Sequence, residues 1–225
     1  MNLINGGDIL KKHILCIGDS NTHGYCADPN DCADGGIRFN EDERWTCLLQ
    51  KALGEEYLVI EEGLSGRTTV FPDPLHENMD VLPYLPALLK SHEDIDLLVV
   101  MLGTNDTKDR FSATAEVITI GLERLLRKAM SIDCWGNKHS NILIVAPAPI
   151  LSEILDSPYA ETMGYHCAEK SQKLAQCYKQ KAEQLGVHFM DANGCEINTV
   201  DFTHLTKKGH RQLADKLISI VPTLI

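Results

Sequence analysis

The sequence predicts an α/β protein with a parallel β-sheet and helices on both faces of that sheet. Short apolar runs alternate with longer segments of helical periodicity along the 225 residues, and this alternation is typical of βαβ units. The run from Asp96 to Leu102 is continuously apolar after its first residue, as expected of a central strand buried on both faces. Because no repeat, low-complexity segment or linker interrupts the chain, we expect one domain over residues 1–225.

Five apolar runs predict the strands, because each is rich in β-branched or apolar residues and too short for a helix. The expected strands are, in chain order, residues 14–17, 57–60, 96–102, 141–146 and 187–190. Apolar residues at helical spacing between the strands predict helices that pack one face on the sheet. One helix is expected roughly over residues 83–91, and the apolar positions that mark the others lie within residues 45–53, 118–130, 174–185 and 213–221.

Capping and turn residues mark the element boundaries. Asn40 followed by Glu43 resembles a capping box before the helix at residue 45. Ser112 is expected to cap the long helix that follows the third strand. The segment from Tyr25 to Phe39 is rich in Asp, Asn and Gly, and the segment from Pro147 to Tyr159 contains three prolines. Both are therefore predicted to be loops.

The charge balance restricts the partners of the protein. With 32 acidic and 21 basic side chains, the formal net charge is -11. This disfavours nucleic acid and anionic membranes as partners, because both require basic patches. No His, Cys or carboxylate cluster has the spacing of metal ligands, so we expect neither a metal nor a cofactor.

Cysteine usage and the N-terminus indicate a cytoplasmic protein. None of the eight cysteines forms a C-x-x-C pair, and most are expected to be small buried residues in a reducing compartment. Cys26 and Cys32 are close enough for a loop disulfide, which the compartment argument disfavours. Residues 1–12 contain no apolar core of signal-peptide length, and no stretch is apolar enough to span a bilayer.

Polar loops follow the first three expected strands, and the carboxyl ends of parallel strands meet at one edge of a sheet. These loops carry Ser20, Gly66 and Asn105. A fourth polar segment, just before the last helix, carries Asp201 and His204. We therefore expect these five residues to lie close together.

The five residues match the chemistry of acyl transfer. A serine hydroxyl is a weak nucleophile until a base takes its proton, and histidine is the usual base near neutral pH. Asp201, three residues before His204, can accept the Nδ1 proton and leave Nε2 for Ser20. The Asn105 amide and a Gly66 backbone N–H can donate to a developing oxyanion.

Simpler interpretations stay open at this point. Ser20 alone also fits the role of a helix cap. The loop from Gly18 to Gly24 could hold a phosphate or another anion at a helix N-terminus, in a non-catalytic α/β module. That module gives no role to Asp201 or His204, and no Walker-type lysine stands near Ser20. The other histidines are poorer candidates for the base: His210 lies inside the last helix, where a packed or solvated side chain is expected.

Four blocks of the sequence resemble the signature blocks of the SGNH, or GDSL-type, serine hydrolases. They are Gly18-Asp19-Ser20-Asn21, Gly63 to Thr69, Gly103 to Asp106, and Asp201-x-x-His204. Their order and rough spacing match along nearly the whole chain. The resemblance implies a flavodoxin-like three-layer α/β/α sandwich with a five-stranded parallel sheet, and hydrolysis of esters through an acyl-serine.

The same resemblance implies a role for each site residue. By the family pattern Ser20 is the nucleophile and also contributes a backbone N–H to the oxyanion hole. Gly66 and Asn105 complete that hole. His204 is the general base and Asp201 orients it.

One branch of the family is especially similar. Arg44 to Thr46, Gly63 to Thr69 and Met101 to Lys108 resemble the bacterial arylesterase, acyltransferase and perhydrolase group, some members of which act on acetylated sugars. This implies small acyl esters, chiefly acetyl esters, as substrates. It leaves open whether water or another alcohol accepts the acyl group. The group tends to oligomerise, so a homo-oligomer also stays open.

The first block departs from the common pattern. Asn21 replaces the usual leucine or isoleucine, and His23 and Tyr25 stand where the arylesterase group tends to carry tryptophan. We expect these changes to make the pocket mouth more polar, and we expect Asp19, His23 and Tyr25 to contact the substrate. For His23 and Tyr25, plain packing within the loop is the alternative.

Overall fold

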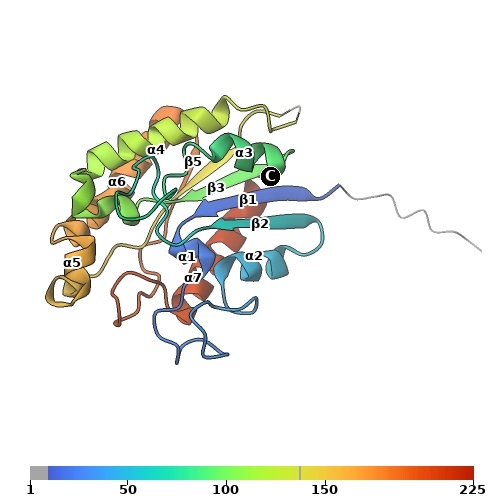
Figure 1. Ribbon diagram of the computed structural model, residues 1–225. Coiled ribbons are helices and arrows are strands. Elements are labelled where there is room, and N and C mark those ends of the chain that lie inside the picture. The colour runs from blue at the N-terminus through green and yellow to red at the C-terminus, as the bar shows by residue number, and fades with distance from the viewer. Residues whose placement is uncertain (1–9, 137) are drawn as a thin grey trace, which may run out of the picture.

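The computed structural model describes residues 10–136 and 138–225 and contains a five-stranded β-sheet between two layers of helices (Figure 1). The strands are β1 (Lys12–Gly18), β2 (Tyr57–Gly63), β3 (Leu97–Met101), β4 (Ile142–Ala146) and β5 (His188–Asp191). All neighbouring pairs are parallel, in the order β2-β1-β3-β4-β5. This is the flavodoxin-like order, so the expected fold class is confirmed.

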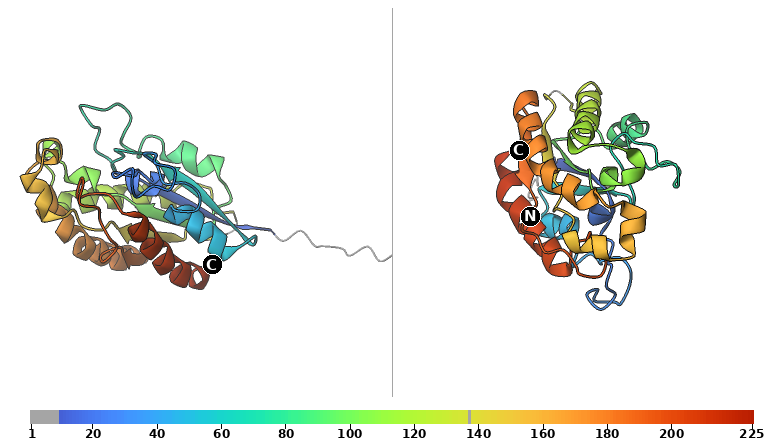
Figure 2. Two further views of the ribbon diagram at one scale, coloured as in Figure 1. Left: turned by 90° about the horizontal axis from the view of Figure 1, so that it is seen from below. Right: turned by 90° about the vertical axis from the view of Figure 1, so that its left-hand side faces the viewer.

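Helices cover both faces of the sheet. They are α1 (Ser20–His23), α2 (Trp45–Leu53), α3 (Leu85–Ser91), α4 (Ala115–Met130), α5 (Tyr159–Met163), α6 (Cys167–Leu185) and α7 (Lys207–Ile220). Apolar residues of α3, α4 and α6 pack with Leu15 and Leu98 in one core, and those of α2 and α7 pack with Ile14 and Leu97 in the other. The side chains of successive strand residues thus point to opposite faces of the sheet and belong to different cores. Figure 2 shows the sheet between α3 on one side and α2 and α7 on the other.

The strand order places a crevice at the carboxyl ends of β1 and β3. From β1 the chain moves outward to β2, and it then returns to β3 on the other side of β1. Connections that leave two adjacent strands in opposite directions open a crevice between them, which is where such sheets bind ligands. Ser20 begins α1 directly after β1, and Asn105 begins a 3-10 turn shortly after β3.

Strand β2 extends three residues beyond the predicted end and stops at Gly63 against α1. A Cβ atom at Gly63 would collide with the backbone of Thr22 and His23. Only glycine therefore allows the end of β2 to approach α1 this closely. This contact places the loop that carries Gly66 beside the turn that carries Ser20.

The start of α2 differs from the expected capping box. The helix begins at Trp45, and Arg44 occupies the N-cap position without a side-chain bond to the helix. The Glu43 carboxylate does accept a hydrogen bond from the Asn40 backbone N–H, at 3.2 Å. The predicted contact between Asn40 and Glu43 is therefore present, but it closes a turn that precedes the helix and does not cap the helix itself.

Two further boundaries were wrong. Thr114, not Ser112, caps α4 through its side-chain oxygen, and Ser112 has a φ of 52° at the end of the preceding 3-10 turn. The predicted loop from Pro147 to Tyr159 contains a 3-10 helix at residues 152–156 and leads directly into α5. The prolines favoured the prediction of a loop, although proline is compatible with the first turn of a helix.

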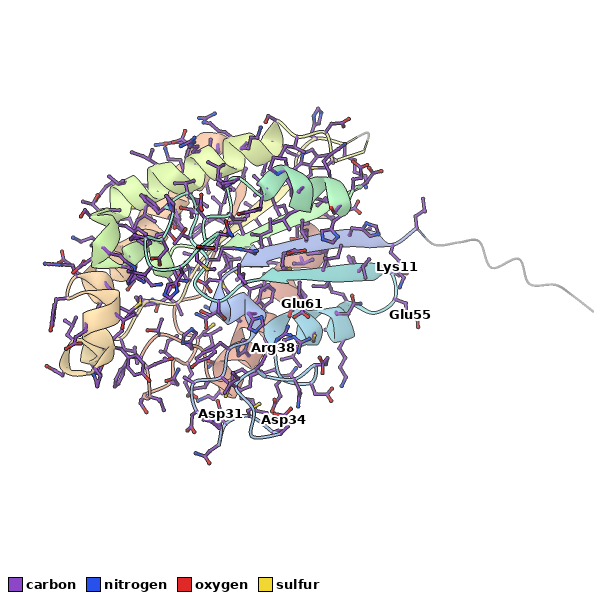
Figure 3. The ribbon with its side chains drawn as sticks, in the orientation of Figure 1. Lys11, Asp31, Asp34, Arg38, Glu55 and Glu61 are labelled. Atoms are coloured by element: carbon purple, nitrogen blue, oxygen red, sulfur yellow. The ribbon has the colours of Figure 1, made fainter. Side chains whose placement is uncertain are left out.

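The segment from Tyr25 to Phe39 is a loop, as predicted, and it is tied to the rest of the molecule at both sides (Figure 3). Arg38 Nε donates to the His23 carbonyl oxygen at 2.8 Å, and Tyr25 and Arg38 form an isolated bridge. The Asp31 carboxylate accepts from the Lys207 backbone N–H at 2.6 Å, at the start of α7. The loop therefore links α1 to α7.

All eight cysteines are free thiols, including Cys26 and Cys32. Residues 1–9, where the sequence predicts no signal peptide, lie outside the described residues. Within the described part of the chain, no helix is long and apolar enough to cross a membrane.

Candidate active site

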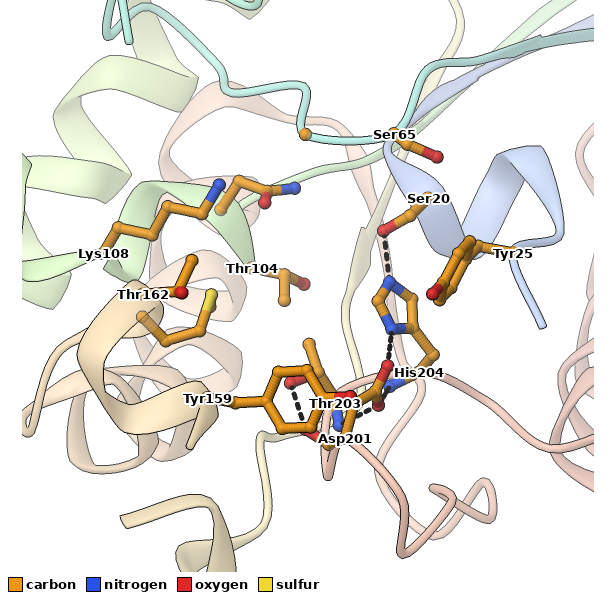
Figure 4. Close-up of a pocket in the computed structure, with 13 residues that line it drawn as sticks. Ser20, Tyr25, Ser65, Thr104, Lys108, Tyr159, Thr162, Asp201, Thr203 and His204 are labelled. Atoms are coloured by element: carbon orange, nitrogen blue, oxygen red, sulfur yellow. Dashed lines mark hydrogen bonds and ion pairs between the residues drawn. The ribbon is translucent and has the colours of Figure 1, made fainter. Parts of the chain in front are cut away.

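Ser20, His204 and Asp201 form a continuous hydrogen-bonded array at the carboxyl edge of the sheet (Figure 4). Ser20 Oγ lies 2.7 Å from His204 Nε2, and His204 Nδ1 lies 2.6 Å from Asp201 Oδ2. The serine comes from α1 and the other two residues from the loop before α7. The imidazole can thus accept the serine proton on one nitrogen while the carboxylate holds the other.

The Asp201 carboxylate is fixed by its own loop. Its Oδ1 accepts hydrogen bonds from Asn198 Nδ2 at 2.9 Å, from the Thr203 N–H at 3.0 Å and from the His204 N–H at 3.1 Å. Burial favours the neutral acid, but the hydrogen bonds from His204, Asn198 and Thr203 outweigh it and lower the pKa of Asp201 to about 2. Asp201 therefore stays ionised at neutral pH and presents Oδ2 to the imidazole.

Asp19, rather than Ser20, caps α1. The Asp19 side chain accepts from the Asn21 N–H at 2.9 Å, and Gly24 ends the helix in a left-handed conformation. This leaves the Ser20 hydroxyl to His204, so the interpretation of Ser20 as a mere cap was wrong. Asp19 is 1% exposed and lies outside the cavity lining, and burial raises its pKa. Asp19 therefore stabilises the start of α1 and does not line the substrate cavity, contrary to expectation.

Of the two residues His23 and Tyr25, only Tyr25 lines the cavity. Its ring packs on the His204 ring with a centroid distance of 4.6 Å. His23 is absent from the cavity lining, and its backbone contacts the long loop through Arg38. Because the left-handed Gly24 turns the chain between them, only Tyr25 faces the site.

Gly66 and Asn105 also line the cavity, as expected. Gly66 has a φ of 88°, a conformation that favours glycine. Asn105 Nδ2 donates to the Arg67 carbonyl oxygen at 3.2 Å. The fully buried Asp106 accepts from the Thr69 N–H at 2.9 Å, which joins the loop after β3 to the loop after β2. These bonds keep the two candidate oxyanion donors at a fixed separation.

The cavity beside Ser20 has a volume of about 270 Å³. Lys108 and Thr162 lie across it from Ser20 and His204 in Figure 4. Seven of its lining residues were missed by the sequence reasoning: Ser65, Thr104, Lys108, Tyr159, Thr162, Met163 and Thr203. Four of these, Ser65, Thr104, Lys108 and Thr203, stand within three residues of a predicted site residue, and this proximity in sequence could have identified them. The residues of α5 carry no such signal.

The remaining histidines take no part in this array. His210 is fully buried in α7, where its Nδ1 accepts from the Trp45 N–H at 3.3 Å, so its expected packed role is confirmed. His92 pairs elsewhere: its Nε2 lies 3.0 Å from Glu62 Oε1. Across residues 10–136 and 138–225, no group of three or more His, Cys, Asp or Glu side chains could hold a metal ion.

A parallel α/β/α sandwich with a Ser–His–Asp array at the crevice beside β1 and β3 is the arrangement of a serine hydrolase. The sequence model of the GDSL-like lipase/acylhydrolase family matches residues 16–212. The chain therefore belongs to that family, and it is a carboxylic ester hydrolase. A Ser–His–Asp triad and an oxyanion hole are typical of the family.

Solved structures agree with this assignment. The chain is 32% identical to a carbohydrate acetylesterase from Sinorhizobium meliloti, with a TM-score of 0.85 over 96% of this chain and 100% of the other. It is 34% identical to an aryl esterase from M. smegmatis, with a TM-score of 0.84 over 95% of this chain and 100% of the other. A lipolytic protein of the G-D-S-L family from Veillonella parvula, 15% identical with a TM-score of 0.67 over 95% and 100% of the two chains, shares the fold. A search of the curated proteins found no match.

Proposed function

We propose that the protein hydrolyses small acyl esters, chiefly acetyl esters, by nucleophilic catalysis at Ser20. The observation that carries this proposal is the pair of short hydrogen bonds that His204 makes, 2.7 Å between Nε2 and Ser20 Oγ and 2.6 Å between Nδ1 and Asp201 Oδ2. His204 takes the Ser20 proton as Oγ attacks the ester carbonyl carbon. The tetrahedral intermediate collapses, the alcohol leaves with that proton, and the acyl group stays on Ser20.

The second half of the reaction repeats the first with a new nucleophile. Water, activated by His204, attacks the acyl-serine and releases the acid. An alcohol in the place of this water gives acyl transfer, so the same site supports both outcomes. The ionised Asp201 stabilises the imidazolium that forms in each half.

Three donors hold the oxyanion in this proposal. They are the backbone N–H groups of Ser20 and Gly66 and the side-chain amide of Asn105. One Asn105 Nδ2 hydrogen is engaged by the Arg67 carbonyl at 3.2 Å, which orients the amide and leaves its second hydrogen for the substrate. Donors fixed in this way need no rearrangement when the negative charge develops.

The cavity supports a small acyl group. Its volume of about 270 Å³ lies below the usual range of pockets for drug-sized ligands. The similar structures include a carbohydrate acetylesterase and an aryl esterase, so acetylated sugars and aryl acetates are the substrates to compare. With p-nitrophenyl esters of rising acyl length, we expect kcat/KM to be highest for the acetyl ester and to fall as the acyl chain lengthens.

The Ser20→Ala variant tests the proposal. The Ser20 hydroxyl lines the cavity and belongs to neither core, so the variant should fold, whereas loss of a triad nucleophile costs on the order of 10⁴ to 10⁶ in turnover. Ser131→Ala is the matched control, because Ser131 lies exposed at the end of α4 and its hydroxyl donates to the Lys128 carbonyl oxygen, far from the cavity lining. If Ser20→Ala kept more than about a tenth of the parent rate, the nucleophile would have to be another group.

A cytoplasmic location and a homo-oligomeric state stay predictions. The first rests on cysteine usage and the second on the resemblance to the arylesterase group. Mass measurement of the purified protein in solution tests the second.

A further inference from the structure

We propose that Asn21 is a positioning residue whose side-chain amide holds the backbone on both sides of His204 in place relative to Ser20. The inference rests on the proposed function, since it takes Ser20 and His204 as the reacting pair. It concerns the position at which this sequence departs from the leucine or isoleucine of the common block.

The Asn21 amide bonds to the backbone on both sides of His204. Its Oδ1 accepts a hydrogen bond from the Leu205 N–H at 2.9 Å, and its Nδ2 donates to the Thr203 carbonyl oxygen at 3.5 Å. The pairs are 184 and 182 residues apart in sequence. Asn21 is 5% exposed, so these bonds are shielded from water. One side chain thus joins the residue after the nucleophile to both neighbours of the base.

Asn21 is itself anchored. Its backbone N–H donates to Asp19 Oδ1 at 2.9 Å, and its carbonyl oxygen accepts from Trp45 Nε1 at 3.1 Å. Trp45 is 1% exposed, and its own N–H donates to His210 in α7 at 3.3 Å. The amide therefore projects from a rigid point that is connected to β1, α2 and α7.

The other bonds around His204 do not replace this connection. The Asp201 carboxylate is held by Asn198 and Thr203, which belong to the same loop. These contacts fix His204 relative to Asp201. The loop is also bonded to other segments, through the Leu151 N–H to the Phe202 carbonyl oxygen and through the Lys207 N–H to the Asp31 carboxylate, but neither Leu151 nor Asp31 belongs to α1. The Asn21 amide supplies the missing restraint between the two segments.

An amide is required for both contacts, because one neighbour offers a donor and the other an acceptor. Leucine, similar in size, would leave the buried Leu205 N–H and Thr203 carbonyl without this partner. A displacement of about 1 Å between reacting groups can cost on the order of 10²-fold in rate. We therefore expect the loss to appear in turnover and not in substrate affinity.

The test compares Asn21→Leu with Thr22→Val on p-nitrophenyl acetate. For Asn21→Leu we expect kcat to fall about 10- to 100-fold while KM changes less than about twofold. Thr22 is the matched control, because it is the next residue of α1, is equally buried, and its hydroxyl has no hydrogen-bond partner. Thr22→Val should keep kcat near the parent value. Asn21→Asp keeps the acceptor for the Leu205 N–H and should have a higher kcat than Asn21→Leu.

The inference is overturned if folded Asn21→Leu keeps kcat within about twofold of the parent. It is also overturned if Thr22→Val loses as much as Asn21→Leu, since general packing would then explain both. If Asn21→Leu does not fold, the comparison is made with Asn21→Ala, which removes the same two bonds without adding bulk. Ser20→Ala separates this inference from the proposed function: an active Ser20→Ala variant refutes the function, whereas an active Asn21→Leu variant beside an inactive Ser20→Ala variant refutes the positioning role alone.

Discussion

Asp201 and His204 are joined at 2.6 Å between Oδ2 and Nδ1, while the other oxygen of the same carboxylate accepts three N–H groups of its own loop. The carboxylate is therefore held in place before it meets the imidazole. With the pKa of Asp201 lowered to about 2, its charge is constant across the working range of a serine hydrolase. The carboxylate can therefore accept the Nδ1 proton throughout that range.

Replacing Asp201 by asparagine should lower kcat/KM strongly, by up to about 10⁴-fold. The amide can present a donor to Nδ1 and select the wrong tautomer. Removing the negative charge also removes the stabilisation of the imidazolium that forms during the reaction. We propose measuring kcat/KM from about pH 5 to about pH 9 for parent and variant. Near-parent rates across this range would show that Asp201 only shapes the loop.

Asn105→Ala should lower kcat by about 10² to 10³ and change KM little. The oxyanion forms only after Ser20 has attacked, so its donor acts on the transition state and not on the bound ester. Steady-state kinetics with p-nitrophenyl acetate separate the two parameters. A loss confined to KM would mean that Asn105 holds the ground-state substrate instead.

The buried His210 should make stability depend on pH. Burial, with smaller contributions from His204 and Arg44, lowers the pKa of His210 to about 3. In the unfolded chain a histidine has a pKa of about 6.5, so below about pH 6.5 the unfolded state binds a proton that the folded state refuses. The free energy of unfolding should therefore fall by up to about 1.4 kcal/mol per pH unit as the pH drops from about 6.5 toward 3.

His210→Asn isolates this effect. The asparagine can still accept from the Trp45 N–H but does not titrate. Asp106 has the opposite slope, because burial raises its pKa to about 6 and it gains a proton on folding in that range. We therefore compare the change in unfolding free energy between about pH 7 and about pH 5 in parent and variant. The parent should lose about 2 kcal/mol more than the variant, and equal losses would show that His210 is not the titrating group.

Activity should survive removal of metal ions, because the serine, imidazole and carboxylate supply both nucleophile and base. Dialysis against a strong chelator should leave kcat/KM unchanged. Loss of activity that a single divalent ion restores would contradict the serine mechanism.

The sequence was sufficient for the fold and for the reacting residues. Ser20 and Asn105 follow strands whose carboxyl ends must meet in a parallel sheet, so their proximity could be predicted before any contact was known. Asp201 and His204 are close in sequence, and a short loop brings them together with few alternatives. Gly66 was found in the same way, as a glycine in the loop after β2.

Contacts that depend on tertiary packing were beyond the sequence. Tyr159 and Met163 line the cavity from a five-residue helix in a proline-containing segment, for which periodicity gives no signal. Whether His23 or Tyr25 faces the cavity depends on how the left-handed Gly24 between them turns the chain, and the sequence does not give that direction. Asn21 was noticed as a departure from the common block, but its bonds span more than 180 residues and could not be inferred from spacing.

The central claim is that Ser20 Oγ becomes acylated and that His204 activates it. The most direct measurement is covalent labelling with a fluorophosphonate, followed by mass spectrometry of the digested protein. We predict that the parent is labelled on the peptide at Ser20 and that the His204→Ala variant is labelled far more slowly. Labelling at a different residue, or labelling of Ser20 at the same rate without His204, would contradict the account.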